Sequence, residues 1–335
     1  MTIIRWGIVG CGNVTEVKSG PGLQKARGSS LVAVMRRNGD LAQDYARRHD
    51  VPTWYDDAAA LIHDPQVDAI YVATPPSSHK AYTIMAAQAG KPVYVEKPMA
   101  LNYAECVAMI DACETANAKG AVPLFVAYYR RSLNRFLKIK ELLDSGAIGS
   151  VRFVNIAFYQ PVREDELNSD ELPWRVLPDV AGGGRFVDEA AHQLDFLDYV
   201  LGPIRTVHGF AANQAGHYPA EDIVSSVFVF ESGVQGVGTW CFSTIDTLDR
   251  TEIVGSKGRI AYSTFDDAPI TLTTSAGTRE FAIGYPIHIQ QPLIQSVVDA
   301  LNGVGICPST GASAARTSWV MDQMLTSYAG KKVGC

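Results

Sequence analysis

The sequence GIVGCGNV at residues 7–14 ends a short run of β-branched and apolar residues, Ile3–Val9. Glycines at positions 10 and 12 let the chain turn tightly after a strand and leave room beside the backbone. A helix that starts directly after such a turn offers free N–H groups to a pyrophosphate. The stretch therefore predicts a strand, a dinucleotide-binding turn and a helix, with a purely structural tight turn as the alternative. Thr15 stands where the usual fingerprint has its third glycine.

The first third of the chain continues with alternating strand and helix patterns. The expected strands are 3–9, 31–35, 67–74, 92–96 and 123–128, and the expected helices are 40–49, 77–89, 102–119 and 134–145. Strands separated by helices of about ten residues indicate βαβ units and a parallel sheet. Residues 1–125 are thus predicted to form an α/β Rossmann domain with a doubly wound parallel sheet.

After about residue 150 the pattern changes to consecutive strands joined by short turns, which indicates an antiparallel sheet. The expected strands are 151–159, 206–212, 224–231, 234–243, 251–254, 259–264 and 270–274, with helices at 188–201, 289–301 and 312–328. Residues 126–335 are therefore predicted to form a second, α+β domain. Its sheet is expected to be open and mainly antiparallel, with the helices on one face.

Composition and charge exclude several classes of protein. A formal net charge of −6 and a pI of about 5.7 argue against a chain that binds nucleic acid or membrane surfaces along its whole length. No uncharged apolar stretch approaches the roughly 20 residues needed to cross a bilayer, and no signal peptide is expected. The six cysteines show no metal-ligand spacing, so we expect reduced thiols in a cytoplasmic protein.

Two arginines, Arg36 and Arg37, follow the second expected strand. In NAD sites an acidic residue usually stands here and accepts hydrogen bonds from the ribose 2′-hydroxyl. Two guanidinium groups instead suit a 2′-phosphate, which a carboxylate would repel. NADP(H) is therefore favoured over NAD(H) as the cofactor. A solvated basic turn, or a swing of Asp40 toward a ribose, remains an alternative.

Two further turns lie at the carboxyl ends of expected parallel strands, the edge at which such sheets bind ligands. Pro75 and Pro76 make a rigid turn before a helix. The sequence EKP at 96–98 places Lys97 where it can hold a substrate oxygen and the cofactor amide, or move protons. Ordinary structural turns are the alternative for both motifs.

The sequence GGGRFVDEAAHQLD at residues 182–195 gives the strongest local signal. Three consecutive glycines are costly in chain entropy and imply a backbone that passes close to something. Asp188 and His192 are four residues apart, so on a helix they share one face, one turn apart. A carboxylate can fix the tautomer of an imidazole and strengthen its hold on a proton, as proton transfer near neutral pH requires. A satisfied pair on a helix surface is the alternative.

Two other chemistries are disfavoured for this stretch. Metal binding by Asp188, His192 and Asp195 would need a second His or Cys cluster, which the sequence lacks, so no metal is expected. A Ser-His-Asp hydrolase would need a GxSxG motif, which is also missing.

Taken together, four motifs resemble the glucose–fructose oxidoreductase/inositol dehydrogenase family, Gfo/Idh/MocA. They are GIVGCGNV at 7–14, ATPPSSH at 73–79, VYVEKP at 93–98 and AGGGRFVDEAAHQLD at 181–195, in family order. The resemblance covers essentially the whole chain. Its most specific part is EKP followed about 85 residues later by GGGxxxDxxxH.

The resemblance implies an NAD(P)-dependent oxidoreductase in which Lys97 positions substrate and nicotinamide, His192 transfers the hydroxyl proton, and Asp188 supports His192. It also implies a cis peptide bond before Pro98, and it makes Tyr128 a weaker candidate for the substrate pocket. The residues expected to bind the cofactor are Gly10, Gly12, Asn13, Val14, Arg36, Arg37, Thr74, Pro75, Pro76, His79, Glu96 and Lys97, together with Trp174 and Arg175, a pair that matches NADP-using sugar reductases of the family.

The expected reaction is reversible hydride transfer between nicotinamide and a secondary carbinol of a sugar, cyclitol or related polyhydroxy compound. The resemblance also implies a homodimer or homotetramer formed through the C-terminal sheet. One alternative is a non-enzymatic NADP-binding regulator, in which the Lys/Asp/His set should have decayed, although here it is complete. The other is an NAD-dependent glycosidase, which Arg36 and Arg37 disfavour.

Overall fold

The computed structural model describes residues 2–116 and 120–328. The chain divides into two compact units, residues 1–133 with 286–315 and residues 134–285 with 316–335. The last residues of the helix expected at 102–119 lie outside the described residues.

The first unit contains a six-stranded sheet in which every neighbouring pair of strands is parallel. Its strands are β1 (Ile4–Val9), β2 (Ser29–Met35), β3 (Thr53–Tyr55), β4 (Ala69–Val72), β5 (Val93–Val95) and β6 (Leu124–Val126), in the spatial order β3-β2-β1-β4-β5-β6. The predicted doubly wound parallel sheet is confirmed. Because the strand order reverses at β1, a switch point lies between the carboxyl ends of β1 and β4, where open α/β sheets bind ligands.

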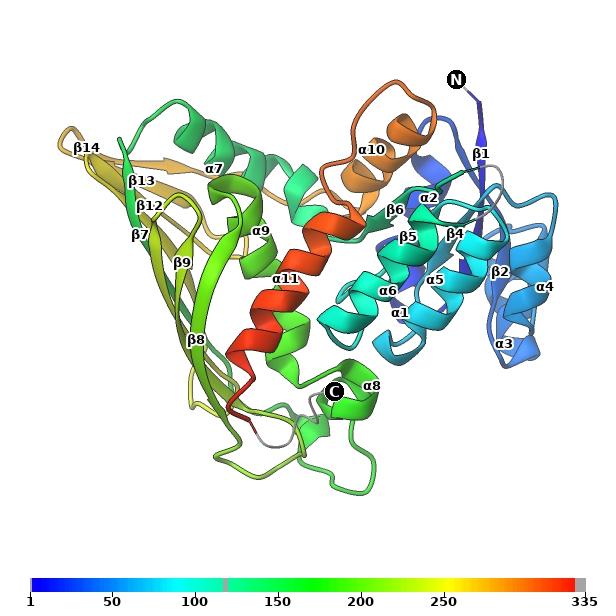
Figure 1. Ribbon diagram of the computed structural model, residues 1–335, viewed down its shortest axis with the longest axis horizontal. Coiled ribbons are helices and arrows are strands. Elements are labelled where there is room, and N and C mark those ends of the chain that lie inside the picture. Colours follow the sequence, from blue (N-terminus) through cyan, green and yellow to red (C-terminus); the bar gives the residue numbers. More distant parts are fainter. Residues whose placement is uncertain (1, 117–119, 329–335) are drawn as a thin grey trace. The chain divides into compact units, whose positions relative to one another are not determined.

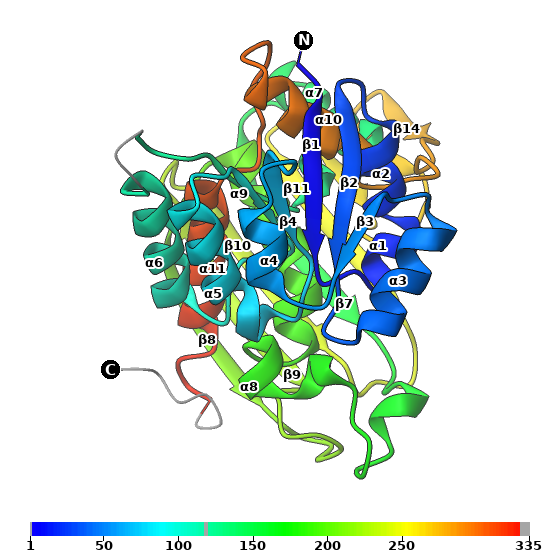
Figure 2. The same ribbon diagram turned by 90° about the vertical axis from the view of Figure 1, so that its right-hand side faces the viewer.

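Helices cover both faces of this sheet (Figures 1 and 2). They are α1 (Asn13–Val17), α2 (Gly20–Lys25), α3 (Gly39–Arg48), α4 (Ala58–His63), α5 (His79–Gln88), α6 (Tyr103–Glu114) and α10 (Gln291–Leu301). Helices α4, α5 and α6 pack side by side, while α1, α2 and α10 form another group. Between the layers, Ile8, Val34 and Ile70 are fully buried. Each such side chain stabilises the fold by about 1.5–3 kcal/mol relative to an exposed one.

Three of these helices begin at a residue whose side chain accepts a backbone N–H from the first turn. Asn38, Asp57 and Asn102 cap α3, α4 and α6 in this way. A cap of this kind is worth about 1 kcal/mol. The cap at Asn38 also fixes where α3 starts, so the two residues between β2 and Asn38, Arg36 and Arg37, are left in a short turn.

Residues 286–315 return to the first unit. The hydroxyl of Ser309 donates to the carbonyl oxygen of Val126 at 2.7 Å, next to the edge strand β6. Ile294 of α10 lies so close to α2 that a Cβ at Gly22 would collide with it. The sequence analysis placed this segment in the second domain, because a linear pattern does not show that a chain crosses back.

The second unit contains an eight-stranded sheet. Its strands are β7 (Val151–Tyr159), β8 (Ile204–Ala212), β9 (Ile223–Phe230), β10 (Gln235–Cys241), β11 (Leu248–Gly255), β12 (Gly258–Tyr262), β13 (Ile270–Thr274) and β14 (Gly277–Phe281), in the order β14-β13-β12-β11-β7-β10-β9-β8. Every neighbouring pair is antiparallel except β7 and β10, which run parallel. The predicted open, mainly antiparallel sheet is confirmed.

Helices lie on one face of this sheet, as predicted, but the helix expected there at 289–301 belongs to the first unit (Figure 1). They are α7 (Asn134–Asp144), α9 (Ala191–Leu201) and α11 (Gly311–Met324), of which the residues from 316 onward belong to this unit. Along β7, Val154, Ile156 and Phe158 are buried at every second position, the period of a strand with one covered face. Between α7 and α9 the rings of Phe136 and Phe196 meet edge to face, with centroids 4.8 Å apart.

Candidate functional site

The turn after β1 has the geometry of a nucleotide-binding turn. Gly10 has a φ of +93°, which residues with side chains rarely adopt, and a Cβ there would approach Thr74 Cγ2 to 2.5 Å. Gly12 has an extended backbone, and a Cβ there would meet nothing closer than the Gly10 carbonyl oxygen at 4.0 Å. Glycine at position 12 is therefore not required by its backbone or by packing within the described chain. The space beside it, and the first N–H groups of α1 at Asn13 and Val14, fit a pyrophosphate.

Thr15 explains how this turn forms without a third glycine. Its buried hydroxyl donates to the Gly12 carbonyl oxygen at 2.8 Å and accepts the Gly12 N–H at 2.9 Å. The Thr15 carbonyl oxygen accepts the Tyr45 hydroxyl at 2.8 Å, and a Cβ at Gly20 would collide with that oxygen. Gly20 thus allows the close packing that the third glycine of the fingerprint usually allows.

Arg36 and Arg37 follow β2 as exposed side chains. Among the residues that the structure describes, no carboxylate forms an ion pair with either. Burial raises the pKa of the Cys11 thiol to about 11, and the charge of Arg36 opposes this rise. Arg36 therefore lies close enough to act electrostatically on the glycine turn, whereas Asp40 is exposed in the first turn of α3.

His79, predicted to bind the cofactor, is fully buried at the start of α5. Its Nε2 lies 2.7 Å from the carbonyl oxygen of Thr74, and its Nδ1 lies 3.1 Å from that of Pro98. Burial lowers the pKa of the imidazole, and the carbonyl oxygens that face its two nitrogens oppose this shift. The ring joins the turn after β4, built on Pro75 and Pro76, to the turn after β5. Direct contact of His79 with the cofactor stays a prediction.

The turn after β5 carries Lys97, which is half-buried. The peptide bond between Lys97 and Pro98 is cis, which confirms that expectation. Glu96 is 7% exposed, and its Oε2 accepts the N–H of Lys97 at 3.1 Å. Its Oε1 accepts the hydroxyl of Tyr71 at 2.5 Å and the amide Nε2 of Gln290 at 2.7 Å. Lys97 thus follows a carboxylate that three donors hold in place.

The three glycines at 182–184 each have a structural reason. Gly182 has a φ of +85° and ends the short helix α8 (Pro178–Ala181). Gly184 donates its N–H to Glu221 Oε1 at 2.7 Å, and a Cβ at this glycine would come within 2.8 Å of the Glu221 carbonyl oxygen. A Cβ at Gly183 would meet the side chain of Val187. The prediction that the backbone passes close to something is correct, and the neighbour is another part of the chain.

Asp188 and His192 lie on either side of a change in helix type. Asp188 belongs to a π-helix, Phe186–Ala190, and His192 to the α-helix α9 that follows it directly. The side chain of Asp188 is 18% exposed and pairs with Arg175, whose Nε lies 3.3 Å from Asp188 Oδ2. The guanidinium of Arg175 also stacks on Trp174, with its Cζ 4.4 Å from the ring centroid. π-helical turns are frequent at functional sites.

A buried ion-pair network beside the π-helix was missed by the sequence analysis. Arg185 is fully buried, and its Nε donates to Glu189 Oε1 at 3.1 Å. Its Nη1 donates to the carbonyl oxygen of Pro161 at 3.1 Å, and Arg163 donates to Glu189 Oε1 at 2.7 Å. Removing one partner of such a buried pair costs about 3–5 kcal/mol. The Arg185–Glu189 spacing is also that of a surface helix pair, so the sequence alone does not show that the pair is buried.

The remaining candidates are less informative. Tyr128 follows β6 and is fully buried, and its place in a substrate pocket stays a prediction. Within the described ranges, no group of three or more His, Cys, Asp or Glu side chains could hold a metal ion. The five described cysteines are free thiols, and Cys335 lies outside those ranges. None of the described helices is long and apolar enough to cross a membrane.

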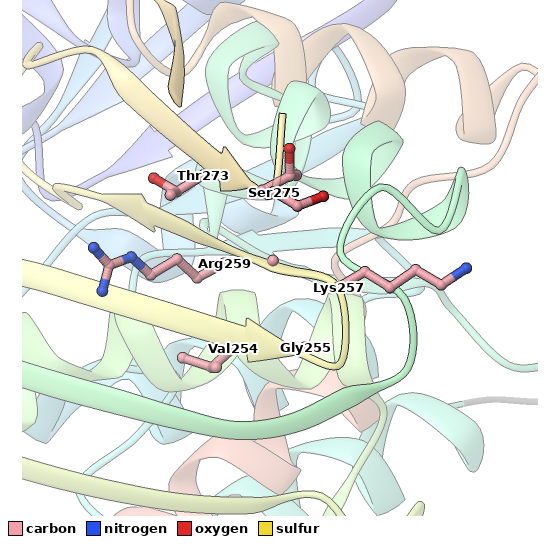
Figure 3. Close-up of a pocket in the computed structure, with 8 residues that line it drawn as sticks. Val254, Gly255, Lys257, Arg259, Thr273 and Ser275 are labelled. Carbon is pink, nitrogen blue, oxygen red and sulfur yellow. The ribbon is translucent and has the colours of Figure 1, made fainter. Parts of the chain in front are cut away.

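An open hollow of about 330 Å³ lies between β11, β12 and β13 (Figure 3). Val254, Gly255, Thr273 and Ser275 contribute to its lining. Its two basic side chains, from residues 257 and 259, extend in opposite directions and do not converge on one point. None of the predicted site residues lines it, so it is distinct from the predicted cofactor and catalytic site.

A parallel sheet whose first turn has room for a pyrophosphate at the switch point is the arrangement of a dinucleotide-binding domain. The chain belongs to the Gfo/Idh/MocA oxidoreductase family. Residues 4–124 match the model described as "Oxidoreductase family, NAD-binding Rossmann fold", and residues 136–261 match the "GFO/IDH/MocA C-terminal domain". The resemblance seen in the motifs is confirmed, and the protein is an oxidoreductase that uses a nicotinamide cofactor.

Named relatives cover most of the chain. Oxidoreductase P35 of Formosa agariphila is 40% identical over 321 residues, which span 95% of this chain and 97% of the relative. The myo-inositol 2-dehydrogenase of Thermotoga maritima is 28% identical, over 82% of this chain and 80% of its own. The trans-1,2-dihydrobenzene-1,2-diol dehydrogenase of Sus scrofa is 28% identical, over 76% of this chain and 72% of its own.

Solved structures share the fold of the whole chain. Levoglucosan dehydrogenase in complex with NADH and levoglucosan has a TM-score of 0.83 at 21% identity, and the match covers 98% of both chains. An oxidoreductase from Agrobacterium radiobacter, in complex with NAD+, L-tartaric acid and magnesium, has a TM-score of 0.83 at 22% identity, covering 98% of this chain and 97% of its own. At these identities the likeness establishes the fold.

Proposed function

We propose that this protein is an NADP-dependent oxidoreductase that interconverts a secondary alcohol and a ketone in a sugar, cyclitol or related polyhydroxy compound. The observation that carries the proposal is the position of Lys97 at the carboxyl end of β5, in a turn fixed by Glu96 and His79. His79 also bonds Thr74, which contacts Gly10 of the nucleotide-binding turn. The lysine therefore stands on the ligand edge of the sheet, near the place where the cofactor enters.

In the proposed mechanism the nicotinamide, when bound, supplies or accepts the hydride. Lys97 donates a hydrogen bond from Nζ to the substrate oxygen and stabilises the charge that develops there. His192 removes the hydroxyl proton during oxidation and returns it during reduction. Asp188 holds the imidazole in the required tautomer and stabilises its protonated form.

Trp174 and Arg175 are proposed to approach the cofactor. Arg175 uses its Nε toward Asp188, and a guanidinium has further N–H donors that remain available to an anionic group. Its side chain is 44% exposed, so these donors are accessible. Arg175 would then contact both the bound cofactor and the carboxylate of Asp188.

The preference for NADP(H) over NAD(H) rests on Arg36 and Arg37. Both are exposed directly after β2, and no described carboxylate pairs with either of them. Their charges are therefore available to a 2′-phosphate. The first carboxylate along the chain after Arg36 that could accept the ribose 2′-hydroxyl is Asp40, four residues on.

We also propose that the second unit forms a homodimer or homotetramer through its sheet. Phe153, Phe210, Val227 and Val237 are between 44% and 78% exposed on β7, β8, β9 and β10. Val227 and Val237 are directly paired across two of these strands. Apolar side chains in adjacent strands form a patch of the kind that protein interfaces cover.

We propose the cytoplasm as the location of the protein. The free thiols of the described cysteines suit this reducing compartment.

The compounds named in the relatives and in one solved structure are the first substrates to test. Myo-inositol, levoglucosan, a dihydrodiol and 1,5-anhydro-D-fructose, the last named in a reductase of Ensifer adhaerens that is 26% identical, should be offered with both nicotinamide cofactors. The change in absorbance of the reduced nicotinamide measures turnover. The proposal predicts turnover of at least one polyol or ketose, and faster turnover with the phosphorylated cofactor. Turnover confined to NAD(H) would contradict the cofactor preference.

A further inference from the structure

Gln290 lies outside every motif that the sequence analysis singled out, yet it contacts the residue that precedes Lys97. It is 1% exposed and belongs to the segment that returns to the first unit. Its Nε2 donates to Glu96 Oε1 at 2.7 Å across 194 positions of sequence. A buried amide is thus hydrogen-bonded to a buried carboxylate directly before the proposed catalytic lysine.

The side-chain amide of Gln290 has one favourable orientation. An ionised carboxylate only accepts hydrogen bonds, so the amide nitrogen must face Glu96. The amide oxygen then accepts the hydroxyl of Tyr94 at 3.1 Å. Tyr94 is itself fixed by stacking on Tyr71, with ring centroids 5.0 Å apart. Turning the amide over would set its oxygen against the carboxylate.

Helix formation does not account for this glutamine. Position 290 is the N-cap of α10, where Ser, Thr, Asp or Asn is preferred. The Gln290 side chain makes no capping hydrogen bond to its own helix. A proline in the first turn, Pro292, already favours the start of the helix. The side chain therefore serves its contact with Glu96.

We propose that Gln290 is a positioning residue for Lys97 and acts through Glu96. Three donors hold the Glu96 carboxylate, and one of them is the N–H of Lys97 itself. Without the Gln290 amide the carboxylate can rotate about its last torsion and loosen the backbone of Lys97. The inference rests on the proposed catalytic role of Lys97. Because a displacement of about 1 Å can cost on the order of 100-fold in rate, we expect a loss of about tenfold or more.

The test compares two glutamines of the same segment. Gln290→Met removes the amide and keeps the length of the side chain. Gln295→Met is the matched control, because Gln295 lies on α10 and bonds the backbone of Arg27 instead. With whichever of myo-inositol, levoglucosan and 1,5-anhydro-D-fructose turns over, kcat should fall about tenfold or more in Gln290→Met and stay within about twofold in the control. The NADPH dissociation constant should stay within about threefold in both.

A double variant separates positioning from general structural damage. If Gln290 acts through Lys97, adding Gln290→Met to Lys97→Met should leave the residual rate unchanged, since residues that work as a unit are not additive. A further proportional loss would overturn the inference. If Lys97→Met is inactive while Gln290→Met keeps full turnover, the inference alone fails. If Lys97→Met keeps full turnover, Lys97 is not a catalytic residue and the inference fails with that role, whereas the absence of turnover in the unchanged protein would contradict the proposed function itself.

Hydrogen exchange gives a second readout without any substrate. The Lys97 amide should exchange faster in Gln290→Met and at an unchanged rate in Gln295→Met. If Gln290→Met does not fold, Tyr94→Phe replaces it, since this change removes only the hydroxyl that orients the amide. Unchanged Lys97 exchange and unchanged turnover in the folded variant would overturn the inference.

Discussion

At the scale of single residues, the proposed preference for NADP(H) rests on Arg36 and Arg37. Replacing both with alanine should weaken NADPH binding by roughly 2–4 kcal/mol, at about 1–2 kcal/mol for each lost charge-assisted contact. NADH has no 2′-phosphate, so its affinity should barely change. Fluorescence titration of both cofactors measures the difference. Equal affinities for the two in the unchanged protein would contradict the preference.

His192 should impose a pH dependence on the reaction. If it is the base for oxidation, the rate should rise with pH as the imidazole loses its proton, because only the neutral ring accepts one. His192→Asn should flatten this rise and lower turnover while NADPH affinity stays nearly intact. A pH–rate profile of the variant tests this. An unchanged profile would move the proton role elsewhere, with Lys97 or Tyr128 as the next candidates.

Asp188→Asn should shift the same rise to lower pH, because an imidazole without its carboxylate holds the proton less tightly. The variant also loses the charge that pairs with Arg175. The double variant with His192→Asn should be little worse than His192→Asn alone. Losses that simply multiply would show that the two side chains do not act together.

The sequence predicted the role of a residue only where that residue lies within one continuous motif. Lys97 and its cis proline come from one short turn, and the resemblance suggested both. Gln290 and the buried state of Arg185 could not be foreseen, because both depend on contacts between distant parts of the chain. Thr15 is an intermediate case. The sequence shows that the third glycine of the fingerprint is missing, but only the packing in the structure shows that Gly20 allows the close approach instead.

At the scale of elements, the turn between β1 and α1 makes a prediction that separates stability from binding. Gly10→Ala must adopt a positive φ and collide with Thr74, so it should destabilise the protein by about 2 kcal/mol or more. Gly12→Ala finds open space and an extended backbone, so stability should change by less than about 0.5 kcal/mol.

The two alanine variants should differ in cofactor binding as well. In Gly12→Ala the added methyl group occupies the room that the pyrophosphate needs, so cofactor affinity should fall although the protein remains stable. Thermal unfolding and fluorescence titration on the same samples check both expectations. Normal cofactor binding by Gly12→Ala would show that the space beside this glycine is not used.

Elements with strong periodicity were predicted well, and short or irregular ones were not. The parallel strands of the first unit and most strands of the second follow their apolar runs. Strand β3 has only three residues, and β14 carries mostly exposed side chains, so neither shows an apolar pattern. The helix expected from residue 188 begins as a π-helix at residue 186, a local change of helix type that the apolar pattern does not show.

At the scale of the whole molecule, the return of residues 286–315 to the first unit is the main feature that the sequence did not reveal. The segment covers the edge of β6 and supplies Gln290 to the turn of Lys97. Its helix was predicted, but the partner of that helix was not, since an apolar face does not name the surface that it covers.

The proposed oligomer makes a prediction at the same scale. Val227→Lys with Val237→Lys places charges on adjacent strands at the centre of the exposed apolar patch. Both side chains are more than 40% exposed, so the protomer should still fold, while the assembly should dissociate. Sedimentation velocity of the two proteins compares their mass. An unchanged mass in the variant would place the interface elsewhere.

Lys97→Met is the single change that tests the proposed mechanism most directly. Methionine keeps the length of the side chain and removes its charge, so folding and NADPH binding should survive. We predict that kcat with an identified polyol or ketose falls by orders of magnitude in this variant. A kcat within about threefold of the unchanged protein, on the order of 0.7 kcal/mol in barrier height, would show that Lys97 is not a catalytic residue.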